Sequence, residues 1–164
     1  MLRGEKWPRL AAIAGVILLS DQVTKSYIRQ TMYLEESIPV IPNLFSLTSI
    51  RNPGAAFGLF AEQSPLFRAA LFATVSVVVL VFLTLLFLQT PKEDVWNLTA
   101  IALLFGGAAG NTIDRLRFGE VVDFLDIYWR DFHWPAFNVA DSAITIGITL
   151  MMIQTFRAGR PTPP

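Results

Sequence analysis

Long apolar stretches separated by short polar segments dominate the chain. The clearest stretch, Ala69–Leu88, contains no charged residue. Crossing about 30 Å of hydrocarbon takes roughly 20 apolar residues, so this pattern predicts helices that span a membrane. We expect four of them, over residues of about 7–27, 67–88, 95–113 and 137–156.

The first predicted span is the least regular of the four. Its apolar core, Leu10–Leu19, runs directly into the segment SDQVTK (Ser20–Lys25). Basic residues before a short apolar run are also typical of a signal peptide, but a small-x-small cleavage site is missing here. We therefore expect an uncleaved helix, with a cleaved signal peptide as the alternative.

The segments outside the spans have a different pattern. Residues of about 28–65 alternate apolar and polar positions between several Pro and Gly, which predicts short strands and turns in a β-rich loop domain. Phe118–Trp134 mixes aromatic and acidic residues, which favours an interfacial helix or loop. The predicted fold is thus an all-α membrane protein with four transmembrane helices, a small extracytoplasmic β-rich loop domain and an interfacial helix, organised as one integral membrane domain over 1–164.

Composition excludes several classes of protein. Hydrophobic residues make up 53% of the chain and charged residues 16%, the opposite of a disordered protein. Lys+Arg and Asp+Glu balance at 13 each, so we expect no nucleic-acid partner. The chain has no Cys, which excludes a thiolate metal site and a cysteine nucleophile. Its single His, His133, argues against a histidine-based catalytic triad or zinc site. We expect no cofactor and no metal, and a catalyst here would use carboxylates or hydroxyls.

Polar residues beside the predicted spans gather on one face of the membrane. The end of an odd-numbered span and the beginning of an even-numbered span lie on the same side. A proton or ion pathway would need such groups through the whole membrane thickness, so this placement predicts a site rather than a pore. The residues concerned are Asp21, Lys25, Asn111, Asp114, Arg115, Asn138 and Asp141.

The spacing of these residues favours contacts between them. Asp21 and Lys25 are four positions apart and can pair on one helix face. Gly106 and Gly110 form a G-x-x-x-G pattern, which lets a second helix approach closely.

Two carboxylates that share a site hold one proton near neutral pH, because like charges raise one pKa. The ionised group can then activate water while the protonated group polarises a scissile carbonyl. Spacing alone does not choose the pair, although Asp141 lies most firmly at the membrane boundary. The candidates are Asp21, Asp114, Asp123, Asp126 and Asp141.

Five ordered blocks of sequence resemble those of the lipoprotein signal peptidase (signal peptidase II) family. They cover nearly the whole chain and are specific as a set: SDQVTK (20–25), RNPGAAF (51–57), GGAAGNTIDR (106–115), VVDF (121–124) and FNVAD (137–141). The resemblance implies a bacterial membrane aspartyl endopeptidase. Such an enzyme cleaves signal peptides from prolipoproteins just before the diacylglyceryl-modified cysteine.

The resemblance also implies roles for individual residues. Asp123 and Asp141 would be the catalytic pair, and Asp114 would be a structural ion-pair partner within its own block. Pro53 departs from the family pattern, in which we expect a small polar residue, and would stiffen the turn after Asn52. The supporting and substrate-binding positions would be Asp21, Lys25, Asn52, Gly107, Asn111, Asp114, Arg115, Asn138 and Ala140.

Localisation follows from the same resemblance and from the basic residues. Lys and Arg are nearly equal in number on the two sides, but the short segments near both termini contain little else. We expect a bacterial inner (cytoplasmic) membrane protein with both termini cytoplasmic and the active site near the extracytoplasmic surface. Its partners would be prolipoproteins and membrane lipid, and the Phe-rich segment Phe45–Phe60 would cover the acyl-chain groove as a lid.

Two other functions compete with the peptidase. A small proton-coupled transporter would distribute charges across the spans, and a non-catalytic bundle that assembles membrane proteins would tolerate loss of Asp123 and Asp141. Outside the site, we expect His133 to be an interfacial residue. The acidic residues expected to be solvated surface charges are Glu35, Glu36, Glu62, Asp126 and Asp131.

Overall fold

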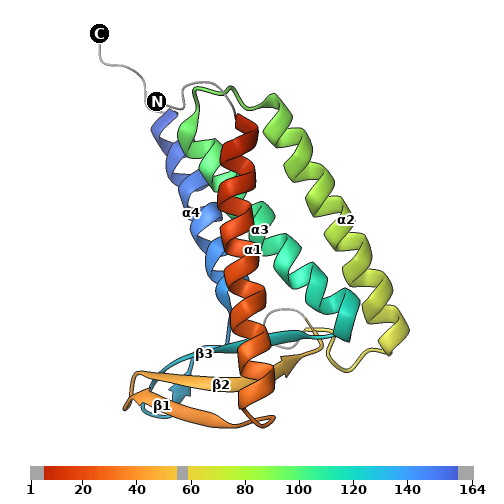
Figure 1. Ribbon diagram of the computed structural model, residues 1–164, viewed down its shortest axis with the longest axis vertical. Helices are drawn as coiled ribbons and strands as arrows, with labels where there is room; N and C mark the ends of the chain where they lie inside the picture. The colour runs from red at the N-terminus through yellow and green to blue at the C-terminus, as the bar shows by residue number, and fades with distance from the viewer. Residues whose placement is uncertain (1–5, 55–58, 159–164) are drawn as a thin grey trace.

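Four long helices lie side by side, with a small sheet at one end of the bundle (Figure 1). The computed structural model describes residues 6–54 and 59–158. The helices are α1 (Lys6–Thr31), α2 (Pro65–Gln89), α3 (Val95–Phe118) and α4 (Val139–Ala158). They contain the predicted spans, except that α4 begins two residues later than expected.

The ends of the helices follow from local sequence. Ser64 caps α2 by accepting a hydrogen bond from the Phe67 N–H at 3.3 Å. Asp94 caps α3 in the same way, accepting from the Asn97 N–H at 3.1 Å. Gly119 ends α3 in the left-handed conformation, with φ of 73°, which a residue without a Cβ adopts at little cost.

Small residues allow α3 to pack closely against its neighbours α1 and α4. A Cβ added to Gly106 would lie 2.9 Å from the Ala14 carbonyl oxygen of α1. A Cβ added to Gly107 would lie 2.5 Å from the Ala140 carbonyl oxygen of α4. The predicted close approach at the G-x-x-x-G segment is therefore confirmed, and it brings the polar ends of three helices together.

By length and apolarity, two helices within the described residues could cross a membrane. They are α2 and the Val139–Arg157 part of α4, and each buries little of its apolar surface inside the protein. The first described residue of α1 and the end of α4 both lie at the end of the bundle away from the sheet (Figure 1). Two of the basic residues near the termini on which the predicted orientation depends, Arg3 and Arg160, lie outside the described residues.

The sheet contains four antiparallel strands in the order β1-β2-β3-β4. β1 (Ser37–Ile41) and β2 (Phe45–Asn52) confirm the predicted strands between the first two helices, although α1 continues beyond residue 28 to Thr31. β2 pairs with β3 (Val121–Trp129), and β4 (Phe132–His133) completes the sheet. The fold is therefore helical with a small antiparallel sheet, rather than all-α.

One prediction is wrong in this region. The predicted interfacial helix over 118–134 is a β-hairpin, because VVDFLDIYW is rich in β-branched and aromatic residues and pairs with β2 along its length. The predicted lid, Phe45–Phe60, begins with an interior strand of the sheet, since β2 is bonded on both sides. Residues 55–58 of that predicted lid lie outside the described residues.

Apolar packing fixes the sheet against the bundle. Ile28 from the last turn of α1 and Met32 just after that helix pack on Val122 and Phe124 of β3, and all four are buried. The sheet is thus held rigidly below the helix ends, where the polar side chains converge.

Candidate active site

Asp141 occupies a fixed position in the first turn of α4. Asn138 precedes the helix, and its side-chain oxygen accepts a hydrogen bond from the Asp141 N–H at 2.9 Å. The Asp141 carboxylate in turn accepts one from the Asn138 N–H at 3.2 Å. This reciprocal arrangement is a capping box, with Asp in place of the usual Glu or Gln. The FNVAD sequence thus orients its own carboxylate.

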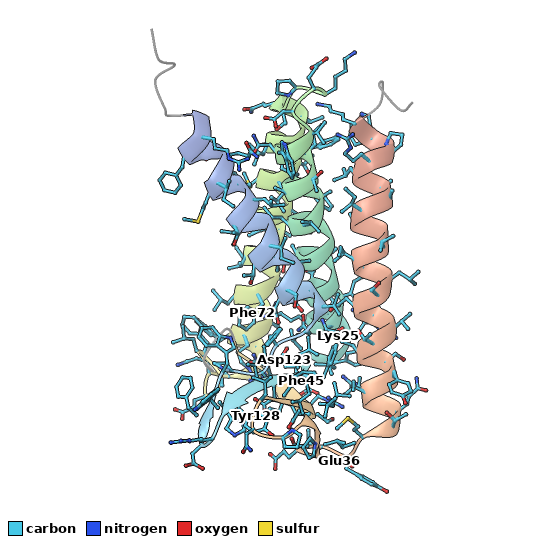
Figure 2. The ribbon with its side chains drawn as sticks, turned by 90° about the vertical axis from the view of Figure 1, so that its left-hand side faces the viewer. Lys25, Glu36, Phe45, Phe72, Asp123 and Tyr128 are labelled. Carbon is cyan, nitrogen blue, oxygen red and sulfur yellow. The ribbon has the colours of Figure 1, made fainter. Side chains whose placement is uncertain are left out.

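Asp123 lies on β3, at the junction of the sheet and the helix bundle (Figure 2). Its two carboxylate oxygens accept hydrogen bonds from different elements. The Asn138 amide donates to one at 2.7 Å, and the Asn52 amide of β2 donates to the other at 3.1 Å. The Asn52 side-chain oxygen accepts from the Gly54 N–H at 3.0 Å, so a turn across Pro53 holds this asparagine in place.

Asn111 of α3 connects the two carboxylates to the rest of the site. Its amide group donates to Asp141 at 2.8 Å. Its side-chain oxygen accepts from Lys25 at 2.9 Å and from Asn138 at 3.3 Å. The side chains that donate to Asp123 and Asp141, those of Asn52, Asn111 and Asn138, are therefore all neutral amides.

Burial shifts the acidity of Asp123. Desolvation, and after it the nearby negative charge of Asp141, raise the pKa of this carboxyl to about 6. The hydrogen bonds from Asn52 and Asn138 oppose the shift, because they favour the ionised form. Asp123 therefore exchanges its proton close to neutral pH.

Asp21, Lys25 and Asp114 form a second cluster, separate from the pair Asp123 and Asp141. The Lys25 ammonium contacts Asp21 at 2.8 Å and Asp114 at 3.2 Å, and all three side chains are buried. Asp21 also accepts from the Ala140 N–H at 2.9 Å, and Asp114 accepts from the N–H of Val122 at 3.2 Å. The cluster thereby joins α1, α3, α4 and β3, and it confirms the predicted pairing of Asp21 with Lys25.

Asp114 and Arg115 do not pair with each other as predicted. Successive positions on a helix face different directions, so Asp114 meets Lys25 while Arg115 points elsewhere. The Arg115 guanidinium lies 4.5 Å from the centre of the Phe72 ring, and it donates weakly to the Gly54 carbonyl oxygen at 3.5 Å. Its Nε is buried and donates to no residue that the structure describes.

A cavity of about 940 Å³ opens beside the two amide-bound carboxylates. Asp123, Asp141 and Arg115 reach it from three elements, and Tyr128 lies on its sheet side (Figure 2). The remaining wall is predominantly apolar and aromatic. It includes Ile127, Trp129, Phe132, Trp134, Phe137, Ile144 and Ile146.

The structure brings together most of the predicted site residues. Gly107 and Ala140 contribute backbone and close packing rather than side-chain chemistry. Among residues 6–54 and 59–158, no group of three His, Asp or Glu residues is arranged to hold a metal ion. The carboxylates of the site are instead fixed by amides and by Lys25.

Two features escaped sequence reasoning. Gln22 donates to both Asp21 and Asp114, at 3.2 and 3.0 Å, and its position inside the SDQVTK block was the available signal. Asp126 was predicted to be a solvated surface charge but is buried, and its carboxylate lies 2.9 Å from the His133 ring nitrogen Nδ1. The hairpin that joins β3 to β4 brings these two residues together, which a predicted helix over 118–134 could not anticipate.

Comparison with known proteins identifies the family. The family model described as signal peptidase (SPase) II matches residues 13–157. The chain belongs to the signal peptidase II family. Its membership confirms the resemblance carried by the five sequence blocks, and it places the chain among bacterial membrane peptidases.

Individual signal peptidase II relatives match over almost their full lengths. The lipoprotein signal peptidase of Geobacter sulfurreducens is 48% identical over 154 residues, which cover 94% of each chain. That of Desulforapulum autotrophicum is 49% identical over 144 residues, covering 88% of this chain and 89% of the relative. A bacterial membrane enzyme solved by the in meso method at 2.3 Å superposes with a TM-score of 0.82 at 37% identity, covering 94% of this chain and 93% of that one.

Proposed function

We propose that this signal peptidase II family member is a membrane aspartyl endopeptidase that removes signal peptides from prolipoproteins. Cleavage takes place just before the cysteine that bears a diacylglyceryl group. The observation that carries this proposal is the pair Asp123 and Asp141, bound by neutral amides and facing an apolar cavity.

In the proposed reaction, the two carboxyl groups share one proton. The ionised group removes a proton from water as the water oxygen attacks the scissile carbonyl carbon, and the protonated group donates its proton to the carbonyl oxygen. Collapse of the tetrahedral intermediate returns a proton to the leaving amine and yields a free carboxylate and a new amino terminus. No covalent enzyme intermediate forms.

We assign the shared proton to Asp123 and the role of base to Asp141. A pKa of about 6 supports a protonated Asp123 at mildly acidic pH. The position of Asp141 in the first turn of α4 favours negative charge there, because the helix N-terminus is electropositive.

The other site residues support this pair. Asn52, Asn111 and Asn138 orient the carboxylates, and Arg115 supplies a positive charge beside the cavity. A further set ties α1 and α3 to the beginning of α4, so that the catalytic groups keep their geometry. This set consists of Asp21, Lys25, Gly107, Asp114 and Ala140.

The apolar cavity suits a substrate that is itself embedded in lipid. Its aromatic and aliphatic wall can receive acyl chains and the apolar signal helix while the peptide bond reaches the carboxylates. We further propose that all four helices span the bacterial inner membrane as one domain. Both termini are then cytoplasmic, and the sheet and active site lie at the extracytoplasmic surface.

Cleavage of a defined substrate tests this function. The full chain, purified in detergent, is mixed with a diacylglyceryl-modified prolipoprotein or with the same polypeptide lacking the lipid. We expect a product that begins at the lipidated cysteine, identified by mass spectrometry, and far slower cleavage of the unlipidated form. Absence of cleavage by folded protein, or equal cleavage of both forms, contradicts the proposal.

A further inference from the structure

A second hollow, of about 350 Å³, lies between the last turns of α1 and α3. It shares no lining residue with the cavity beside Asp123. Arg29 and Gln30 line it from α1, and Arg117 and Phe118 line it from α3. We call this the Arg29–Arg117 hollow. The proposed peptidase chemistry uses neither of its arginines.

Two guanidinium groups in the Arg29–Arg117 hollow stack on one aromatic ring. The Arg29 Cζ lies 3.7 Å from the centre of the Phe118 ring, and the Arg117 Cζ lies 5.1 Å from the same centre. Stacking engages the face of a guanidinium and leaves its N–H groups free to bind an anion. The Arg29 Nη1 atom is buried and yet donates to no described residue.

Positive charge at this hollow is poorly neutralised. Arg51 of β2 is close enough to Arg29 for their repulsion, together with burial as the larger cause, to lower the pKa of Arg51. The Arg51 side chain reaches Glu120 only at 3.8 Å. Asp114, on the inner wall of the hollow, is already bound by Lys25. Two guanidinium groups therefore line the hollow and a third, that of Arg51, lies near Arg29, so an additional anion in this space would be favourable.

The location of the Arg29–Arg117 hollow indicates the source of that anion. The residues that line the hollow belong to the last turns of α1 and α3, and these ends of the helices face the sheet (Figure 1). If the helices span a membrane, the hollow lies at headgroup depth. Exposed apolar side chains adjoin its lining residues in the sequence, including Tyr27 next to Ser26, at 64% exposure, and Leu116 next to Arg117, at 73% exposure. An acyl chain can lie along these side chains while its headgroup enters the hollow.

We propose that the Arg29–Arg117 hollow binds the phosphate group of an anionic phospholipid. Guanidinium groups bind phosphate oxygens through paired, charge-assisted hydrogen bonds, and two arginines on different helices can hold one phosphate between them. Such a lipid would link the end of α1 to the end of α3 beside the Lys25 cluster. The inference depends on insertion of the helices in a membrane and not on peptide cleavage.

Lipid binding to the purified full chain tests the inference. Native mass spectrometry in a non-ionic detergent measures retention of added phosphatidylglycerol and of phosphatidylcholine, which carries no net charge. We expect selective retention of phosphatidylglycerol, with an affinity about tenfold weaker in Arg29→Gln and in Arg117→Gln. Arg130→Gln, which removes the same charge from an exposed turn, is the matched control and should retain wild-type affinity.

Three results would overturn the inference. If Arg130→Gln weakened the affinity for phosphatidylglycerol as much as Arg29→Gln and Arg117→Gln, only the overall charge of the protein would attract the lipid. If phosphatidylcholine were retained as well as phosphatidylglycerol, the hollow would not select for anions. Displacement of the lipid by millimolar inorganic phosphate would assign the hollow to a soluble anion. Because Arg117 is exposed, Arg117→Gln keeps the test valid if Arg29→Gln fails to fold. No peptide substrate is present, so a negative result leaves the proposed peptidase function untouched.

Discussion

Two pairs of carboxylates lie in one hydrogen-bond network, with Asp21, Asp114 and Asp123 buried and Asp141 half-buried, and the pairs differ in the groups that face them. Asp21 and Asp114 share the ammonium group of Lys25 and have no contact with the large cavity. Asp123 and Asp141 receive hydrogen bonds from neutral amides and line that cavity.

This difference separates a scaffold from a reactive site. Removing the cation from a buried ion pair is costly, because it leaves the carboxylate buried without a compensating charge. Carboxylates that face each other's charge and only neutral donors can exchange a proton near neutral pH. Asn111 joins the two pairs, since it accepts from Lys25 and donates to Asp141. The scaffold pair therefore sets the geometry of the reactive pair.

The largest effect on stability is expected for Lys25→Met. The substitution leaves Asp21 and Asp114 buried without their cation, which should lower the free energy of unfolding by about 3–5 kcal/mol. Chemical denaturation in detergent measures this loss. Lys92→Met, in an exposed turn at the other end of the bundle, is the control and should change little. If Lys25→Met unfolded with the same free energy as the wild type, Asp21 and Asp114 would not form the scaffold that distinguishes them from Asp123 and Asp141.

A smaller loss of stability, with a loss of activity, is expected for Gly107→Ala. The added Cβ would meet the Ala140 carbonyl oxygen and push α4 away from α3, at a cost of about 1–3 kcal/mol. Because Ala140 binds Asp21 and adjoins Asp141, both pairs should be disturbed. Gly15→Ala is the matched control, since an added Cβ there meets nothing within 4 Å. Equal thermal stability and cleavage rates in the two variants would contradict the packing described.

Asn52→Ala should reduce cleavage about tenfold while hardly changing stability. The substitution removes one hydrogen bond that positions Asp123, which should cost about 1.4 kcal/mol of transition-state stabilisation, and it leaves the Lys25 cluster intact. Comparing kcat/KM with the melting temperature separates the two effects. A large fall in melting temperature would show that Asn52 belongs to the scaffold instead.

The smallest effect is a shift in the pH profile of Asn52→Ala. With Asp123 at a pKa of about 6, the singly protonated pair becomes scarcer above that pH, so kcat/KM of the wild type should fall as pH rises through about 6. The Asn52 hydrogen bond favours ionised Asp123. Its loss should therefore move this fall to higher pH by less than about one unit. A shift to lower pH would contradict the proposed protonation state.

The helical part of the fold was largely predictable from the sequence. Charge-free runs such as Ala69–Leu88 are local signals, and this run marks the helix α2. The pairing of Asp21 with Lys25 also follows from spacing on a single helix. These predictions hold because each depends on residues that are close in the chain.

Contacts between distant segments were not predictable in the same way. The segment Phe118–Trp134 could form a helix or a strand, and pairing with β2 decides in favour of the strand. The burial of Asp126 beside His133 depends on that hairpin. Likewise, the partner of Asp114 lies on α1 rather than at the next position in the sequence. Family resemblance, not spacing, singled out Asp123 from the other acidic residues.

The most direct test of the reactive pair is to measure cleavage and stability together in Asp123→Asn and Asp141→Asn. Each substitution removes one carboxylate and nearly preserves shape. Because the pKa of Asp123 is raised by folding, its ionisation lowers the free energy of unfolding as pH rises from about 3.8 to about 6. At pH 7, Asp123→Asn removes this destabilising charge. That gain offsets the weaker hydrogen bonds that a neutral amide makes in place of the carboxylate. We predict that cleavage of the lipidated prolipoprotein falls by about 10⁴-fold in both variants, while melting temperatures stay near that of the wild type. Substantial cleavage by either folded variant would contradict the assignment of these two residues as the catalyst.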